Sequence, residues 1–174
     1  LSAAMRRRDR PTTWGLKGSF TPVVERGDRL EVCERTLADG TVFEPVDLDA
    51  VRAQARQLAD GGCEAVCVFF INGYANADNE KRAVEAVREV WPNDYVTAAT
   101  EILPEIREFE RLSTATLNAY LQPVVSSYLD RLERGLAERG FGGDVLIVQS
   151  NGGVMSVGTA KRFPVPTALS GPAA

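Results

Sequence analysis

The pattern of apolar and polar positions predicts helices that alternate with buried strands. Apolar residues recur at helical spacing between Leu48 and Leu58, and again between Ala83 and Trp91. The run 63–71, apolar except for one glutamate, and the run 95–100 are typical of strands, the first of them covered on both faces. Helices that alternate with such strands predict an α/β fold with a mostly parallel sheet and crossover helices.

The first helix and the segment before it carry clear start and stop signals. Asp47 is placed to cap the helix start, and the pair Gly61-Gly62 is placed to end the helix. Upstream, residues 29–36 and 41–46 have an extended pattern and are separated by Asp39-Gly40. Asp-Gly between apolar stretches favours a tight turn, so we expect two extended segments joined at this dipeptide.

The longest periodic stretch predicts one helix from about Ser113 to Arg139, which ends at Gly140. Pro123 lies inside this helix and removes a backbone hydrogen bond, so we expect a kink or a break. The apolar face of the helix is expected to be buried against the 63–71 strand or against a partner chain. That face comprises Leu117, Leu121, Val124, Val125, Tyr128, Leu129, Leu132 and Leu136.

The composition is that of a soluble globular protein. Apolar residues make up 44 % and charged residues 25 % of the 174 positions. The net charge of −4 gives no general attraction for nucleic acid or an anionic membrane, and no apolar stretch reaches the length of a membrane span. The three cysteines lack C-x-x-C spacing and favour a reducing compartment. We therefore expect a cytoplasmic protein with neither a nucleic-acid nor a membrane partner.

Histidine is absent from the sequence, and this excludes several kinds of catalytic site. A Ser-His-Asp triad, a Cys-His pair and a His-ligated zinc ion cannot be built from this chain alone. A Walker-type phosphate loop is excluded as well, because the chain has no G-x-x-x-x-G-K-[ST] motif. The sequence predicts no metal site and identifies no catalytic residue.

The segment 105–111, just before the long helix, holds three carboxylates and two guanidinium groups in seven residues. Acidic residues near a helix start complement the helix dipole, so a capping role is one interpretation. The other is that Arg107 and Arg111 clamp an anion or lock a neighbouring domain. They are four residues apart and would point the same way on a helix, with Glu108 and Glu110 to orient them.

A second candidate site follows a strand expected over 144–149 and precedes a short helix expected over 156–162. It comprises Ser150, Asn151, Gly152 and Gly153. Paired glycines let backbone N–H groups approach a ligand, whereas the alternative is a turn that requires a positive φ. A third and weaker candidate, near the end of the chain, comprises Ser170 and Gly171.

Several separated motifs occur in the order found in the hydantoinase A / 5-oxoprolinase family. They are ILPEIREFERLSTATLNAYLQPVVSSYLDRLERGL, VLIVQSNGGVMS and AKRFPVPTALSGPAA, with RLEVCERTLADGTVFEPVD and EAVCVFFINGYANADNEKRAVE upstream. Over nearly its whole length the chain resembles an N-methylhydantoinase A-like member of that family. The resemblance implies that residues 1–112 are the end of the N-terminal hydantoinase/oxoprolinase region. Residues 113–174 would then be the long helix and the start of the catalytic hydantoinase A region.

The resemblance implies a part of an ATP-dependent hydrolase that opens cyclic amides of the hydantoin or 5-oxoproline type by phosphorylating a carbonyl. It implies an architecture like that of actin, sugar kinases and Hsp70, which is ribonuclease H-like. ATP and magnesium are expected for the full-length family member, with none bound by these 174 residues alone, which are expected to be inactive. The implied partners are a small cyclic amide, the rest of the same chain and a hydantoinase B-type subunit or domain.

Two other functions stay open alongside this one. The chain could belong to a subunit of an acetone-type carboxylase that acts through phosphorylated intermediates, or it could be a non-catalytic assembly module. Asn72 and Asn79 stand where many relatives have histidines, so no metal or proton-transfer role is expected there. Gly152 and Gly153 are expected to shape a loop that faces an interdomain cleft, because the phosphate loops of the family lie elsewhere.

Overall fold

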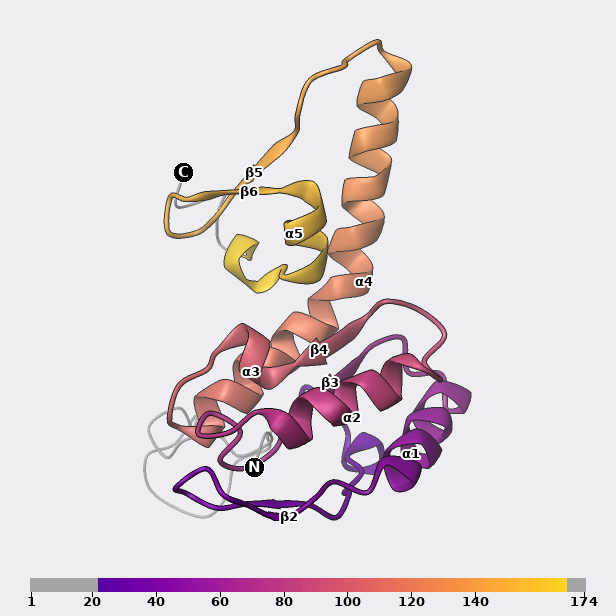
Figure 1. Cartoon of the computed structure of the whole chain (residues 1–174). Coiled ribbons are helices and arrows are strands. Elements are labelled where there is room, and N and C mark those ends of the chain that lie inside the picture. Colours follow the sequence, from indigo (N-terminus) through magenta and orange to yellow (C-terminus); the bar gives the residue numbers. More distant parts are fainter. Residues whose placement is uncertain (1–21, 169–174) are drawn as a thin grey trace, which may run out of the picture.

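The computed structural model describes residues 22–168, and Figure 1 shows two parts that share one long helix. In chain order the elements are η2 (Arg26–Asp28), β1 (Arg35–Thr36), β2 (Val42–Glu44), α1 (Leu48–Asp60), β3 (Val66–Val68), α2 (Asp78–Arg88), β4 (Val96–Ala98), α3 (Ala99–Ile102), α4 (Glu108–Glu138), β5 (Leu146–Val148), β6 (Val154–Ser156), α5 (Val157–Arg162) and η3 (Val165–Thr167). The lower part in Figure 1 holds the elements from β1 to α3, and the upper part holds β5, β6 and α5. Helix α4 begins in the lower part and packs against α5 in the upper part.

The signals at the first turn and the first helix are confirmed. Gly40 lies in the turn between β1 and β2 with a φ of +87°, and the Asp39 carboxylate accepts a hydrogen bond of 2.9 Å from the Thr41 N–H. The Asp47 carboxylate accepts hydrogen bonds from two N–H groups in the first turn of α1 and so caps this helix. After α1 the chain turns at Gly62, which has a φ of +88° that glycine adopts without strain.

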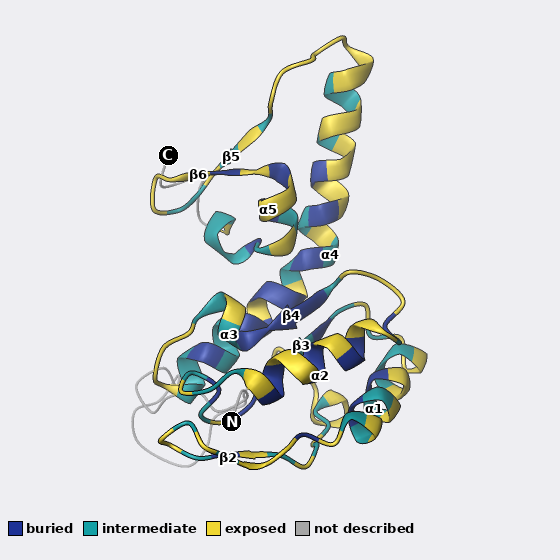
Figure 2. Ribbon diagram, viewed as in Figure 1, coloured by how far each residue is buried: buried dark blue, intermediate teal, exposed yellow. Residues whose placement is uncertain are grey.

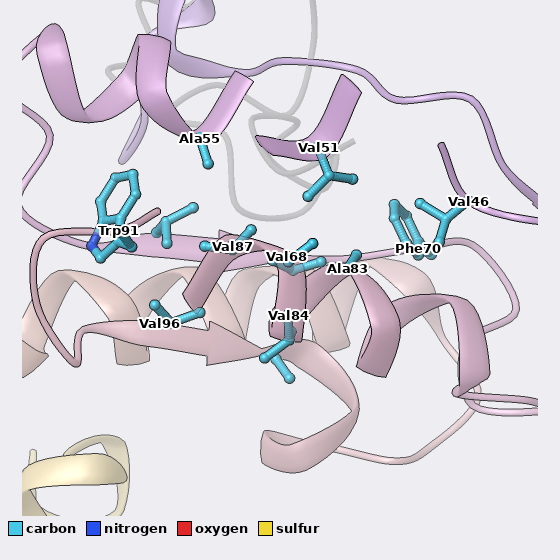
Figure 3. Close-up of a cluster of buried hydrophobic side chains, with 13 residues drawn as sticks. Val46, Val51, Ala55, Val68, Phe70, Ala83, Val84, Val87, Trp91 and Val96 are labelled. Carbon is cyan, nitrogen blue, oxygen red and sulfur yellow. The ribbon is translucent and has the colours of Figure 1, made fainter. Parts of the chain in front are cut away.

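The core of the lower part is built on a β3–α2–β4 unit. The strands Val66–Val68 and Val96–Ala98 pair in parallel, residue by residue, and α2 is the crossover between them. Figure 3 shows Val51 and Ala55 projecting from α1 toward Val87 of α2. All three side chains are buried, as the apolar periodicity of the two helices predicts.

The α/β class is confirmed, but the expected mostly parallel sheet is wrong for the described residues. The strands form three two-stranded sheets, of which β3–β4 is parallel while β1–β2 and β5–β6 are antiparallel. A short turn can join only antiparallel neighbours, and such turns follow β1 and β5. Strand β6 and the short helix α3 were not expected from the sequence pattern.

Helix α4 begins at Glu108, before the expected start at Ser113, and its last residue is Glu138. It is continuous through Pro123, so the expected break does not occur, although the ribbon in Figure 1 turns between its lower and upper halves. Gly140, with a φ of +79°, follows the helix as expected. No helix within residues 22–168 has the length and apolar character needed to cross a membrane.

The apolar face expected for α4 is only partly buried. Leu129 is 2 % exposed and packs with Met155 of β6, but Val124 and Tyr128 are 69 % and 56 % exposed. Figure 2 shows much of the upper half of α4 exposed. Where α4 meets β3 and β4, the buried residues are instead small or polar, because polar side chains there find hydrogen-bond partners. They include Ala115, Thr116, Asn118, Ala119 and Gln122.

Candidate functional site

A buried cluster of charged side chains lies at the carboxyl ends of the parallel strands β3 and β4. Arg111 comes from the first turns of α4 and Glu80 from the first turn of α2, and both side chains have an exposed fraction of 0 %. Glu108, one turn before Arg111, completes the cluster with a side chain that is 23 % exposed. Ligands of open α/β sheets bind at the carboxyl ends of parallel strands, so this cluster is the first place to consider.

The Arg111 guanidinium is held from several sides. Its Nη1 donates to Glu108 Oε2 at 2.6 Å and to the Phe70 carbonyl at 3.4 Å. Its Nη2 lies 3.5 Å from Glu80 Oε2, an ion-pair distance at which no hydrogen bond is formed. Nε and Nη2 have no hydrogen-bond partner among residues 22–168. The guanidinium stacks on the rings of Phe69 and Tyr74, with its carbon 5.0 and 5.9 Å from the ring centres.

Glu80 ties the ends of the two strands together. Its Oε1 accepts hydrogen bonds of 2.6 Å from both the N–H and the hydroxyl of Thr100, which follows β4. Its Oε2 accepts a hydrogen bond of 3.2 Å from the N–H of Phe70, which follows β3. Burial raises the pKa of this carboxyl, while the hydrogen bonds and Arg111 act in the opposite direction. Every oxygen of Glu80 is therefore engaged in the fold.

The loop after β3 wraps around this cluster and depends on two unusual residues. Asn72 has a φ of +60°, its N–H donates to Glu108 Oε1 at 2.8 Å, and its side chain donates to the Thr36 carbonyl at 2.9 Å. A Cβ on Gly73 would lie 2.9 Å from Arg111 Nη2 and 3.0 Å from Glu80 Oε2. Glycine at position 73 leaves room for the guanidinium and the carboxylate, which would have to shift to admit a Cβ.

Asn79 is also fully engaged. Its Oδ1 accepts a hydrogen bond of 3.0 Å from the Val46 N–H, and its Nδ2 donates to Glu34 Oε2 and to the Glu44 carbonyl at 2.9 and 3.0 Å. The side chain thus fixes the segment around β2 to α2. Within the described part of the chain, no group of three or more His, Cys, Asp and Glu side chains is placed to hold a metal ion.

Arg107 and Arg111 lie in different environments, and a joint role of the two in binding an anion stays a prediction. Arg107 precedes the first helical residue, has a φ of +96° and is exposed, whereas Arg111 lies inside the helix and is fully buried. The four-residue spacing aligns two side chains only when both residues are helical. Glu110 lies in the first turn of α4 and is half-buried.

The glycine pair lies in the turn between β5 and β6. Gly152 has a φ of +83°, and its N–H donates to the Gln149 carbonyl at 3.0 Å. The Gly153 N–H donates to Asn151 Oδ1 at 2.9 Å, and the Gln149 N–H donates to the Gly153 carbonyl at 2.7 Å. The N–H and hydroxyl of Ser150 both donate to the Pro166 carbonyl, at 2.7 and 2.8 Å. These donors are used within the chain, as in a hairpin turn, and a role of the turn in ligand binding stays a prediction.

The structure does not bring these two candidate sites together. The charged cluster lies at the start of α4 in the lower part, and the 149–153 turn lies at the end of β5 in the upper part (Figure 1). The third candidate, Ser170 and Gly171, lies outside the described residues.

A buried polar seam, which was not expected, joins the two parts. Asn118 Nδ2 donates to Thr97 Oγ1 at 3.1 Å, and the Thr97 hydroxyl donates to Gln122 Oε1 at 3.1 Å. The amides of Asn118 and Gln122 both donate to the Arg162 carbonyl, at 3.1 and 3.0 Å. Two amide residues four positions apart on the expected helix were the available signal, but their partners are distant in sequence.

The sequence of the chain matches models of two protein-family regions. Residues 2–91 match the hydantoinase/oxoprolinase N-terminal region, and residues 111–174 match the hydantoinase/oxoprolinase region that follows it. The chain belongs to the hydantoinase/oxoprolinase family. This confirms the family expected from the motifs, whereas the boundary expected between residues 112 and 113 stays a prediction.

Two relatives with longer chains show how much of a family member this chain represents. The chain is 37 % identical over 153 residues to an uncharacterized protein of Methanocaldococcus jannaschii, a match that covers 88 % of this chain and 22 % of the relative. It is 33 % identical over 151 residues to the caprolactamase alpha subunit of Pseudomonas jessenii, and this match covers 87 % of this chain and 22 % of the relative. The chain therefore spans about a fifth of the length of these curated relatives.

Solved structures of two enzymes have the same fold over this region. The ATP-dependent caprolactamase from Pseudomonas jessenii superposes with a TM-score of 0.76 at 33 % identity, covering 82 % of this chain and 20 % of that chain. The nucleotide-free structure of acetone carboxylase superposes with a TM-score of 0.74 at 27 % identity, and the match covers 89 % of this chain and 22 % of that chain. Relatives in this family thus include ATP-dependent enzymes of two reaction types.

Proposed function

We propose that this chain is part of an ATP-dependent hydrolase that opens small cyclic amides of the hydantoin or 5-oxoproline type through phosphorylation of a ring carbonyl. The observation that carries the proposal is the likeness to an ATP-dependent caprolactamase, with 33 % identity and a TM-score of 0.76. A 5-oxoprolinase of Saccharomyces cerevisiae is also similar, at 28 % identity over 132 residues. Both names describe enzymes that act on a cyclic amide, and an amide carbonyl becomes a better electrophile once its oxygen is phosphorylated.

The described residues do not themselves fit a complex of ATP and magnesium. They contain no cluster of metal-binding side chains, and the buried Arg111 is enclosed by protein groups. In the 149–153 turn, the N–H groups of Gln149, Ser150, Gly152 and Gly153 donate within the chain. We assign the binding of ATP and magnesium to regions of the longer family protein outside residues 22–168, in an actin- and Hsp70-like architecture. We derive no phosphoryl-transfer step for this chain.

The two arginines of the 105–111 segment have different roles in this proposal. Arg111 fixes the start of α4 to the ends of β3 and β4, through Glu108 and the Phe70 carbonyl. Arg107 lies immediately outside this fixed region and is exposed. We assign to Arg107 the contact with an anionic substrate or phosphorylated intermediate in the cleft of the complete enzyme, and to Arg111 the positioning of the helix.

An acetone-type carboxylase subunit is the alternative function. Its support is the acetone carboxylase structure, with a TM-score of 0.74, and 32 % identity over 137 residues to the acetophenone carboxylase gamma subunit of Aromatoleum aromaticum. Several of these relatives are named as subunits, so a hydantoinase B-type partner fits either function.

The deciding experiment is a substrate panel with the family-length protein that carries this chain and its partner subunit. Caprolactam, hydantoin and 5-oxoproline would be tested for ATP-dependent ring opening, and acetone and acetophenone for ATP-dependent incorporation of labelled bicarbonate. Ring opening coupled to ATP hydrolysis is the expected result. Carboxylation of a ketone, with every cyclic amide left intact, would replace the proposal with its alternative.

A further inference from the structure

The β5–β6 sheet has two apolar faces, and only one of them is covered by the described residues. Ile147 and Met155 lie opposite each other in the pairing and belong to the cluster formed with Leu129 of α4. Side chains alternate along a strand, so their neighbours lie on the other face. There Leu146 and Val154 are 57 % and 60 % exposed.

The uncovered face has the character of a sheet interior. It carries Leu146, Val148, Val154 and Ser156, with no charged side chain. Each strand pairs along one edge only, so the outer edges of β5 and β6 have no strand partner within residues 22–168. A lone two-stranded sheet is marginally stable in water, and apolar residues on both faces are typical of sheets covered on both sides.

A cleft of mixed character lies beside this face. It has a volume of about 560 Å³, and its lining combines the apolar residues Leu136, Phe141, Leu146 and Val157 with the charged residues Glu133 and Asp144. Phe141 is 49 % exposed, so an aromatic ring stands open next to the sheet. The face and the cleft form one surface that offers both a flat apolar area and a recess, which we call the β5 surface.

We propose that the β5 surface docks the remainder of the hydantoinase A region of the longer family protein, which adds a strand to the open edge and covers the apolar face. The match to the hydantoinase/oxoprolinase region begins at residue 111 and continues to residue 174, so β5, β6 and α5 all belong to that region. The chain spans 22 % of the caprolactamase alpha subunit, so most of such a protein lies outside it. An uncharged face suits permanent cover within one polypeptide better than a separable contact, whose interfaces are more polar.

The test compares the same substitutions in two settings. One is the 174-residue chain alone, and the other is the Pseudomonas jessenii caprolactamase alpha subunit with its matching segment replaced by this chain. Leu146→Lys and Val154→Lys place a charge on the β5 surface. In the longer protein each is expected to lower the Tm by about 4 °C or more, and in the chain alone to change it by less than about 2 °C. Phe43→Lys is the matched control, since Phe43 is a 74 % exposed apolar residue of β2 outside the surface.

A second measurement uses the chain alone and needs no chimera. The chain is expected to be a monomer by light scattering and to bind an apolar fluorescent dye, with the binding reduced by Val154→Lys and not by Phe43→Lys. A dimer that Val154→Lys dissociates would show that a second copy covers the surface and would overturn the proposal. Equal Tm changes for Val154→Lys in both settings, or an equal loss for Phe43→Lys in the longer protein, would overturn it as well. Neither measurement depends on which reaction the complete enzyme catalyses.

Discussion

Arg111 of α4 and Glu80 of α2 face each other with Nη2 3.5 Å from Oε2, and neither side chain has any exposed surface. The two residues are brought together from different helices at the ends of β3 and β4, and Glu80 is held there by Thr100 and Phe70. If one partner of a buried ion pair is removed, the other charge still bears the free-energy cost of desolvation but no longer has the attraction that offsets it. The pair therefore fixes the direction in which α4 leaves the lower part of the molecule.

Replacement of Arg111 by Met is expected to lower the free energy of unfolding by roughly 3–5 kcal/mol, the range seen when one member of a buried pair is removed. Urea unfolding monitored by circular dichroism gives this value. Arg52→Met is the matched control, because Arg52 forms its ion pair with Glu89 at the surface and should contribute little. An equally small effect of both substitutions would show that the cluster is not a structural anchor.

The pH dependence of stability should carry a signature of Glu80. Its folded-state pKa is raised by burial, so its contribution to stability is present below the unfolded pKa and is lost as pH rises through the folded pKa. The free energy of unfolding of the native protein, minus that of Glu80→Gln, should fall as the pH increases from the ordinary glutamate range. Asp39 should give the opposite slope against Asp39→Asn, because the Thr41 hydrogen bonds lower its pKa. A Glu80 difference that rises with pH would mean that the hydrogen bonds from Thr100 and Phe70, together with Arg111, outweigh burial.

The two sides of α4 can be separated by a pair of substitutions. Leu129→Ala removes a side chain that is 2 % exposed and should cost about 2–5 kcal/mol of unfolding free energy. Val124→Ala alters a side chain that is 69 % exposed and should change stability by less than about 0.5 kcal/mol. Thermal or urea unfolding of both variants would check this, and similar losses at the two positions would place the buried face of the helix elsewhere.

A larger residue at Gly73 should destabilise the protein, since a Cβ there would lie 2.9 Å from Arg111 Nη2. We expect Gly73→Ala to destabilise the protein by about 1–3 kcal/mol, as overpacking of a filled site does. Gly135→Ala is the comparison on α4, where a Cβ would meet nothing within 4 Å. It should stabilise the helix by about 0.5–1 kcal/mol. If calorimetry shows a gain for both variants, the guanidinium can move aside and the close packing is not a constraint.

Local signals in the sequence predicted the elements whose causes are local. The cap at Asp47, the turn at Gly40 and the helical periodicity of α1 and α2 depend on residues a few positions apart, and all are present in the structure. Strand β6 was not expected, whereas the equally short β5 was, because β5 lies within the longer apolar run 145–148. Its antiparallel pairing follows from the glycine turn at 149–153, for which a turn was only one of the interpretations.

The errors concern contacts between distant residues. The buried side of α4 carries Asn118 and Gln122, whose partners are Thr97 of β4 and the Arg162 carbonyl at the end of α5. An argument from apolar periodicity predicts that a valine is buried and an amide exposed. The hydrogen bonds that make burial of the amide favourable are not visible in a sequence. For the same reason Arg111 was recognised as unusual while its partner Glu80, on another helix, was not.

The last prediction separates the two arginines of the candidate site by substitution to lysine in the family-length enzyme. Arg111→Lys should lower the Tm, because lysine cannot reproduce the stacking on Phe69 and the hydrogen bonds to Glu108 and the Phe70 carbonyl. Arg107→Lys should leave the Tm unchanged, since Arg107 is exposed and precedes the helix. It should nevertheless reduce turnover, because a lysine offers an anionic group no planar pair of donors.

Turnover per folded molecule and Tm must be measured separately for these two variants. Arg134→Lys on the exposed side of α4 serves as the control for a change from arginine to lysine at the surface, and it should alter neither quantity. A fall in turnover for Arg107→Lys at constant Tm places this side chain at the cleft of the complete enzyme. Unchanged turnover in Arg107→Lys would remove it from the candidate site and leave the 105–111 segment with the structural role of Glu108 and Arg111, which form an ion pair of 2.6 Å with each other.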